Sequence, residues 1–269
     1  MVDLKIIELY KMNNFMVYLG NNKENKALHD FSLYLEKEKR CNNNFHPVFS
    51  YIQKLFECNE TTLTSNESLY RARKIKQGDE NIINTGNEED GFYGFNKMNS
   101  FVCPTNKAQP NRANFEGVSC LYTAKDDSSV IAEKTAISEI RPFIGKEISI
   151  STIRPKRDLK LFDLYFHPQD QYEDIIKSPR SRFWLDIAIR FSIPYEKSNQ
   201  NEYLLTQCLA EYFRQAGFDG IRYTSTMYEG GQNIAIFNCK HEDDGGNYEI
   251  CEPICSTTRF IKNIDYSFE

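Results

Sequence analysis

The feature that most constrains the fold of this chain is a succession of short strand-like runs with only a few helix-like segments between them. Strands alternate side chains with a period of two, and several runs of five to eight residues fit that pattern. Those runs are residues 69–75, 118–123, 147–153, 159–164, 221–225 and 233–238. Helical spacing of apolar residues predicts helices over 130–140 and 203–216. This mixture predicts an α+β domain with a mixed β-sheet core.

The two ends of the chain differ from this central part. Residues 31–39 and 45–58 have helical apolar spacing, so we expect an N-terminal helical region over 1–65 that attaches to the main domain. Residues 59–67 are rich in Thr, Ser, Asn and Glu, which is typical of a loop. Residues 77–98 are polar and contain glycine, which predicts a long surface loop. We expect the central domain over 66–240 and an irregular tail over 241–269.

Composition limits the classes of function. The chain is 40% hydrophobic, which is enough to build a core, and its formal net charge is −5. A net negative chain is a poor candidate for a surface dedicated to nucleic acid or to anionic membranes, although a local basic site is compatible with it. No apolar run approaches the roughly 18 residues that span a bilayer, and residues 1–10 lack the pattern of a secretory signal. We therefore expect a cytoplasmic protein.

Eight cysteines raise the question of a disulfide framework or a metal site. Without a signal sequence, reduced and scattered thiols are the expectation. The tightest cluster combines Cys239, His241, Cys251 and Cys255. Zinc sites usually use two short-spaced pairs on rigid turns, and here the first pair has a single intervening residue. We therefore predict no metal, with a zinc site as the less favoured alternative.

The standard catalytic patterns are missing. The sequence has no Walker loop, no G-x-G-x-x-G, no H-E-x-x-H and no G-x-S-x-G, and it has only four histidines. None of these histidines has a convincing serine or cysteine partner, so a histidine-based triad is a weak proposal.

Several strings of residues nevertheless occur in an informative order. They are LYRAR at 69–73, NRANFEGV at 111–118, LYTA at 121–124, TAISEIRP at 135–142, DLKLFDL at 158–164, GFDGIRYTS at 217–225 and NIAIF at 233–237. In this order the strings resemble the RES-domain family, which is named for its Arg, Glu and Ser positions. The resemblance covers roughly residues 68–238.

This resemblance has implications that composition and spacing do not provide. It implies a fold related to the ADP-ribosyltransferases and NAD⁺ as a substrate rather than a resident cofactor. Members are typically bacterial toxins that deplete NAD⁺ by phosphorolysis or hydrolysis of the nicotinamide–ribose bond, so inorganic phosphate is a candidate co-substrate. The resemblance also implies a partner, a helix-turn-helix antitoxin of the Xre type.

The resemblance also suggests the site residues. Arg71 and Arg112 match the family's arginines and would hold phosphates, since a guanidinium binds oxyanions with paired hydrogen bonds. Arg73 is an alternative to Arg71, because a strand with a period of two turns both side chains to the same face. Asn111 stands where the family usually has glycine, a mild change because both residues tolerate positive φ.

The remaining candidates surround the ribose and the bases. Tyr122 would stack on a ring, and Ser225 would orient the nicotinamide riboside part, with Asn114 and Asn233 as supporting substrate-binding residues. The glutamate has two candidates. Family spacing points to Glu133, whereas the surrounding residues match at Glu139, and we prefer Glu139. A carboxylate there would stabilise the positive charge that develops on the ribose.

Two further functions stay open. The protein could transfer ADP-ribose from NAD⁺ to a protein. It could also be a catalytically silent module that binds NAD⁺ or a partner, because a fold can persist after its chemistry is lost. Label from NAD⁺ appearing on a macromolecule would identify the first, and binding without turnover would identify the second.

Overall fold

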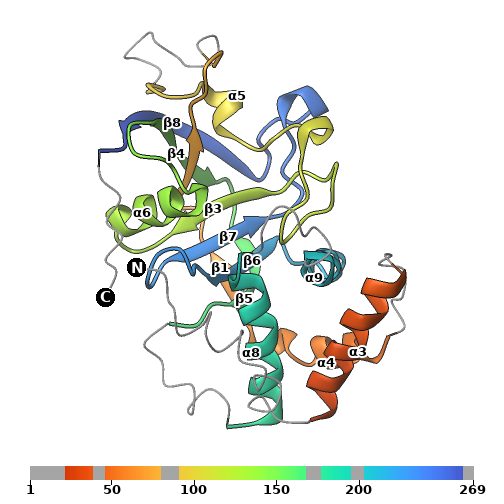
Figure 1. Cartoon of the computed structure of the whole chain (residues 1–269). Coiled ribbons are helices and arrows are strands. Elements are labelled where there is room, and N and C mark those ends of the chain that lie inside the picture. The colour runs from red at the N-terminus through yellow and green to blue at the C-terminus, as the bar shows by residue number, and fades with distance from the viewer. Residues whose placement is uncertain (1–21, 39–45, 80–90, 168–176, 195–202, 263–269) are drawn as a thin grey trace.

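The structure is a computed structural model that describes residues 22–38, 46–79, 91–167, 177–194 and 203–262 (Figure 1). The predicted α+β class with a mixed sheet is confirmed. One sheet of eight strands has the order β1-β5-β6-β7-β3-β2-β4-β8. The pair β5–β6 is parallel and the other neighbours are antiparallel. The strands are β1 (Glu60–Leu63), β2 (Leu69–Lys74), β3 (Leu121–Lys125), β4 (Glu147–Pro155), β5 (Leu159–Leu164), β6 (Gly220–Thr224), β7 (Gln232–Ile236) and β8 (Cys251–Phe260).

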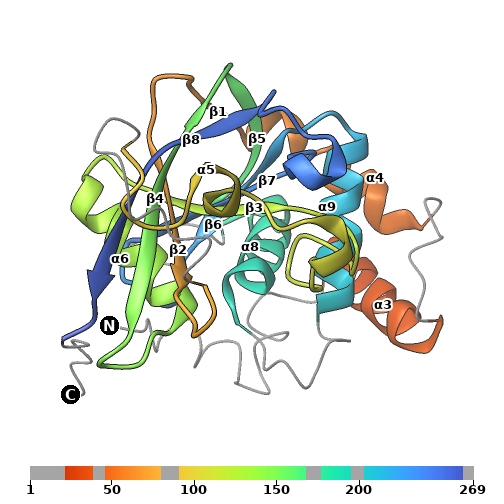
Figure 2. The ribbon, with the colours of Figure 1, turned by 90° about the horizontal axis from the view of Figure 1, so that it is seen from above.

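Helices lie around this sheet, and their labels follow Figure 1. The α-helices are α3 (Lys23–Glu38), α4 (Pro47–Gln53), α5 (Lys97–Ser100), α6 (Ser129–Ile140), α8 (Pro179–Ser192) and α9 (Leu204–Gln215). Short 3₁₀ turns are η1 (Phe56–Cys58), η3 (Thr105–Lys107) and η5 (Glu242–Asp244). Figure 2 shows α5 and α6 beside β2 and β4, and α3, α4 and α9 gathered at the other side of the molecule.

Alternation along β5 divides the interior into two clusters. Phe162 and Leu164 belong to the larger cluster, which also contains the apolar residues of α3, α4, α8 and α9. Leu159 and Leu161 belong to a second cluster with residues of β3, β7 and β8. Because successive strand residues point to opposite faces, the two clusters lie on opposite faces of the sheet. Burying each of these large side chains stabilises the fold by about 1.5–3 kcal/mol.

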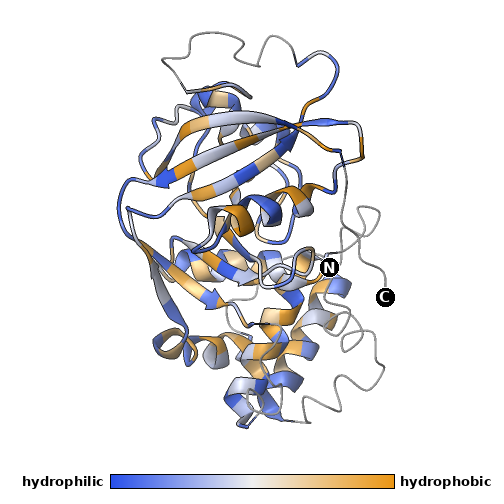
Figure 3. Ribbon diagram, turned by 90° about the vertical axis from the view of Figure 1, so that its left-hand side faces the viewer, coloured by the Kyte–Doolittle hydropathy of each residue, from blue (hydrophilic) through white to orange (hydrophobic). Residues whose placement is uncertain are grey.

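The N-terminal helices share the larger cluster with the sheet. Phe31 of α3 packs edge-on against Phe49 of α4 at 5.1 Å between ring centroids, and Phe49 contacts Tyr212 of α9 at 4.5 Å. The predicted helices in this region are therefore confirmed, and they pack on the main domain as expected. Figure 3 shows that the helices at this end alternate between hydrophobic and hydrophilic positions, which is the pattern of helices with one buried face.

Helix α6 crosses the same sheet over β2 and β3. Small residues make the contact, with Ala136 of α6 packed against Ala72 and Ala124. The hairpin between β6 and β7 also approaches closely, because a Cβ atom on Gly231 would lie 2.5 Å from Thr135 Oγ1. The helix ends at Arg141, which caps it in the left-handed conformation with φ of 46°. These contacts fix α6 over β2 and β3, with the hairpin between β6 and β7 beside Thr135.

Two sequence-based expectations were wrong, and one helix was missed. Residues 59–67 were expected to form a loop, but β1 lies there and pairs with β5. The tail over 241–269 was expected to be irregular, but β8 lies within it and pairs with β4 along its length. Helix α8 was not predicted at all. The long loop predicted over 77–98 falls partly outside the described residues, and its described part ends in α5 and buries Phe95.

Candidate active site

A partly buried carboxylate joins three of the predicted site residues. Glu139, in the last turn of α6, accepts a hydrogen bond from Ser225 Oγ at 2.7 Å and another from Asn233 Nδ2 at 2.5 Å. Both bonds end on Oε1 of Glu139. Ser225 follows β6 and is fully buried, and Asn233 lies on β7. The carboxylate is therefore fixed by donors from two neighbouring strands.

Glu133, the alternative glutamate, lies elsewhere. Its carboxylate forms an ion pair with Arg259 of β8 at 3.8 Å, and both side chains are partly exposed. Six helical residues turn through about 600°, so positions 133 and 139 cannot share a face. The structure therefore brings Glu139, and not Glu133, into contact with Ser225 and Asn233.

Arg112 supplies a positive charge near this carboxylate. Its side chain is only 5% exposed, and the guanidinium carbon lies 5.5 Å from the centre of the Tyr223 ring. Burial lowers the pKa of Arg112, but Tyr223, Glu139 and Tyr203 outweigh burial, so the pKa lies above its ordinary value. The Arg112 Nε atom is buried without a hydrogen-bond partner. The guanidinium thus stays charged, and its Nε is enclosed by the protein.

Tyr223 and Tyr203 are residues that the sequence reasoning missed. Tyr223 lies inside the GFDGIRYTS string and is 3% exposed. Burial raises its pKa above the ordinary tyrosine value. Position 223 shares a strand face with Ser225, so the two-residue period was a signal that could have found it. Tyr203 has no comparable signal, because it lies at the start of α9, far from Arg112 in the sequence and outside the ordered strings.

A tight turn presents Arg112. Asn111 and Asn114 exchange backbone hydrogen bonds, with N–O distances of 3.0 and 3.3 Å. Asn111 Oδ1 also accepts the Arg112 backbone N–H at 2.8 Å. The described non-glycine residues with positive φ are Arg141, Asn238 and Tyr248, so position 111 does not use the conformation that glycine favours. Asparagine here closes the turn with its side chain instead.

Tyr122 holds the same turn from β3. Its hydroxyl accepts the Ala113 N–H at 2.9 Å and donates to Asn114 Oδ1 at 2.7 Å. Asn114 in turn donates its amide to the carbonyls of Gln109 and Phe115. Burial raises the pKa of Tyr122 well above its ordinary value, so the hydroxyl keeps its proton. Tyr122 and Asn114 therefore lie behind Arg112, and ring stacking by Tyr122 stays a prediction.

Arg71 contacts a different part of the sheet. It alternates on β2 with Tyr70 and Ala72, which pack against α6, so its side chain leaves the strand on the other side. Its Nη1 donates to the Tyr122 carbonyl at 3.3 Å, and Nε is buried without a partner. Burial, with repulsion from Arg73, lowers the pKa of Arg71 to about 10. Arg73 instead packs on the Phe95 ring at 4.7 Å and donates to the Asn99 carbonyl.

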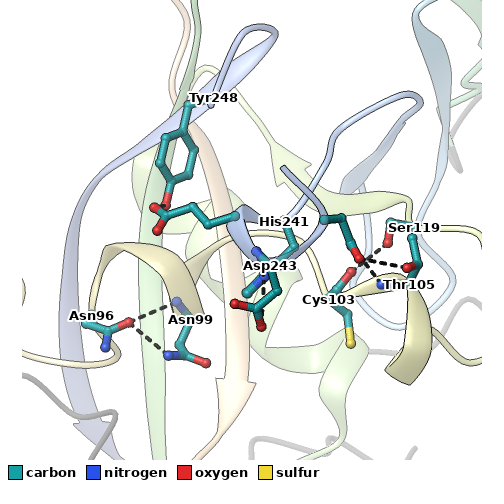
Figure 4. A network of polar contacts seen from close by, with 10 residues as sticks. Asn96, Asn99, Cys103, Thr105, Ser119, His241, Asp243 and Tyr248 are labelled. Atoms are coloured by element: carbon teal, nitrogen blue, oxygen red, sulfur yellow. Dashed lines mark hydrogen bonds and ion pairs between the residues drawn. The ribbon is translucent and has the colours of Figure 1, made fainter. Parts of the chain in front are cut away.

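The cysteine and histidine cluster near the C-terminus shows no metal-like arrangement. Among the residues that the structure describes, no group of three or more His, Cys, Asp or Glu side chains could hold a metal ion. His241 Nδ1 instead accepts the Asp243 N–H at 3.1 Å and caps η5 (Figure 4). Asp244 of the same turn accepts two hydrogen bonds from Thr105 at 2.8 Å each. This network joins η5 to the loop that leads to Arg112.

Comparison with known proteins decides the family. The RES domain matches residues 89–257. The chain belongs to the RES-domain family. The RES-domain match contains Arg112, Tyr122, Glu139, Ser225 and Asn233, whereas Arg71 precedes it.

Other comparisons add less. No curated protein matches the chain. A solved structure described as the M. tuberculosis MbcT–MbcA toxin–antitoxin complex matches with a TM-score of 0.39 and 10% identity, over 78% of this chain and 92% of that one. In this RES-domain protein, no helix of the described residues is long and apolar enough to cross a membrane.

The site offers specific chemistry. A fixed carboxylate can stabilise a cationic carbon and accept hydroxyl protons, and a buried guanidinium can bind an anionic group. Glu139 on α6 and Arg112 in its turn both lie on the side of the sheet that α6, α8 and α9 cover. The site therefore suits a substrate in which a carbon that develops positive charge lies near an anionic group.

Proposed function

We propose that this protein cleaves the bond between nicotinamide and ribose in NAD⁺ and so acts as a toxin that depletes NAD⁺. The observation that carries the proposal is the Glu139 carboxylate, fixed through Oε1 by Ser225 and Asn233 within a domain of the RES family. Breaking this bond builds positive charge on the ribose, as in glycoside cleavage through an oxocarbenium-like state. A carboxylate held in place before the reaction can stabilise that charge without reorganising.

The residues present suit the rest of the reaction. Nicotinamide leaves as a neutral molecule from a cationic precursor, so the departure needs no strong general acid. The low histidine content is therefore compatible with the proposal. Arg112 would bind the pyrophosphate, which carries two negative charges, through its guanidinium. We leave Arg71 out of this site, because its side chain leaves β2 on the face opposite to α6.

The attacking group and the partner are parts of the same proposal. Phosphate would give ADP-ribose 1″-phosphate, and water would give ADP-ribose, with nicotinamide released in both cases. A toxin of this kind needs a protein that restrains it, and we propose an Xre-type antitoxin as the partner. The matched solved structure is described as a toxin–antitoxin complex, which is a statement about that protein.

The experiment compares three purified proteins. Wild type, Glu139→Gln and Glu133→Gln are each incubated with NAD⁺, with and without inorganic phosphate, and free nicotinamide and both ribose products are measured. We expect wild type and Glu133→Gln to release nicotinamide. In Glu139→Gln the rate of nicotinamide release should fall at least about 100-fold, because the fixed charge that stabilises the cationic ribose is removed. Intact NAD⁺ in the wild-type reaction would overturn the proposal. Label found on protein would instead indicate an ADP-ribosyltransferase.

A further inference from the structure

We infer that Gln207 of α9 is a positioning residue for Arg112, acting through the backbone carbonyl of Asn111. The inference rests on the proposed function for its effect on NAD⁺ but on geometry for the contact itself. Gln207 Nε2 donates to Asn111 O at 2.9 Å, across 96 positions of sequence. The Gln207 residue is 4% exposed and Asn111 is exposed, so this hydrogen bond anchors a surface turn to a buried amide.

The accepting carbonyl is central to the turn. Asn111 O accepts both the Asn114 N–H at 3.3 Å, which closes the turn, and the Gln207 amide. A carbonyl oxygen has two lone pairs, so these two donors satisfy it fully. Removing Gln207 leaves the Asn111 carbonyl with only the 3.3 Å hydrogen bond that closes the turn. The turn would then relax, and Arg112 at its tip would move with it.

The helix that carries Gln207 is a rigid support. Leu205, Leu209 and Phe213 of α9 are buried in the larger cluster, together with residues of α8 and the sheet. Gln207 is also buried, but it lies about 200° around the helix from Leu205 and so on another side, and a buried amide usually has a partner. Tyr122 of β3 also holds the turn, and Ala113 of the turn is buried in the same cluster as the apolar residues of α9. Gln207 attaches the turn to α9 by a hydrogen bond from its amide to the Asn111 carbonyl.

The hydrogen bond from Gln207 affects the site because Arg112 lies close to the residues that hold Glu139. The Arg112 guanidinium lies over Tyr223, which is paired in register with Asn233, one of the two donors to Glu139. The hydrogen bond from Gln207 of α9 therefore helps to hold the Arg112 guanidinium at its distance from the Glu139 carboxylate. We expect loss of Gln207 to weaken binding of the anionic part of NAD⁺ more than the chemical step.

The test uses Gln207→Met, which keeps the side-chain length but cannot donate a hydrogen bond. The matched control is Gln215→Met on the same helix, where the exposed amide donates to Glu211 Oε1 at 2.8 Å. We expect KM for NAD⁺ to rise about tenfold in Gln207→Met with kcat changed less than about threefold, since the Asn111 carbonyl loses one of its two donors. Gln215→Met should match wild type. Should Gln207→Met not fold, Gln207→Leu takes its place, because leucine is also apolar and cannot donate.

Two further measurements make the result decisive. Gln207→Met is combined with Arg112→Gln, and we expect no further rise in KM in that background, because the first residue acts through the second. Hydrogen exchange of the peptide that spans residues 108–118 should be faster in Gln207→Met and unchanged in Gln215→Met.

Each outcome separates the inference from the proposed function. Multiplicative effects on KM, an unchanged KM in Gln207→Met, or unaltered exchange of the turn would each overturn the inference while NAD⁺ cleavage stands. If wild type leaves NAD⁺ intact, the proposed function fails, and the exchange measurement alone then decides whether Gln207 holds the turn.

Discussion

The two donors to Glu139 allow a quantitative prediction for Ser225→Ala. The change removes a 2.7 Å hydrogen bond to the carboxylate and leaves the 2.5 Å bond from Asn233 in place. Hydrogen bonds to charged groups contribute about 1.5–3 kcal/mol. If the orientation of Glu139 matters mainly in the transition state, that range lowers kcat by roughly 10- to 150-fold with little change in KM.

The control for this prediction is the next hydroxyl along the chain. Thr226 is also buried, and its Oγ1 donates to the Ser192 carbonyl at 3.0 Å, away from Glu139. Thr226→Val should lower the free energy of unfolding about as much as Ser225→Ala does, by roughly 1–3 kcal/mol, and leave kcat near wild type. Nicotinamide release gives kcat, and urea unfolding gives stability. Equal loss of kcat in both variants would refute the reasoning, because it would show a general effect of stability.

Three more predictions concern the surroundings of the site. Tyr122→Phe leaves Ala113 N and Asn114 Oδ1 without their partner, so urea unfolding should show a loss of about 1–3 kcal/mol and KM for NAD⁺ should rise; unchanged stability would contradict this role. Gly231→Ala places a Cβ atom 2.5 Å from Thr135 Oγ1, so the hairpin between β6 and β7 must move away from α6. We expect the free energy of unfolding to fall by roughly 1–3 kcal/mol and kcat to fall as well. Gly117→Ala has open space around it but a positive φ, so it should lower stability and leave kcat unchanged. Burial raises the pKa of Asp219, but hydrogen bonds from Arg157 and the Lys160 N–H outweigh burial and lower that pKa below the ordinary value. The ionised Asp219 therefore stabilises the folded state at pH values above the unfolded pKa near 3.9. This contribution is lost as pH falls through the folded pKa. Asp219→Asn should therefore show a smaller loss of stability between about pH 5 and pH 2 in acid unfolding, and an identical acid transition would contradict the assignment.

Much of the fold could be predicted from the sequence because the strands of the central domain alternate clearly. The failures have physical reasons. Strand β1 is only four residues, ETTL, and its polar alternation reads like the loop around it. Strand β8 contains Pro253 and several hydroxyl residues, which is acceptable because it lies at the sheet edge, next to a bulge. Helix α8 did carry a signal, with Pro179 at its first position after the capping Ser178.

The site was predictable only where the residues lie in ordered strings. Glu139 and Ser225 come from such strings, and the structure places them in contact. Tyr203 and Gln207 come from α9 and contact Arg112 and its turn. Local sequence does not encode such contacts, since Gln207 and Asn111 are 96 positions apart. Electrostatics also escapes local reasoning, because the pKa of Arg112 depends on which groups the fold gathers around it.

The order of the strands determines how far the protein can be shortened without exposing new sheet edges. The two edges of the sheet, β1 and β8, come from the segments on either side of residues 66–240. A shortened protein limited to those residues would turn β5 and β4 into new edges with rows of unpaired backbone donors and acceptors. Such edges invite pairing with other chains. The flanking strands thus cover those rows of backbone groups, and a shortened protein that keeps this sheet has to retain both.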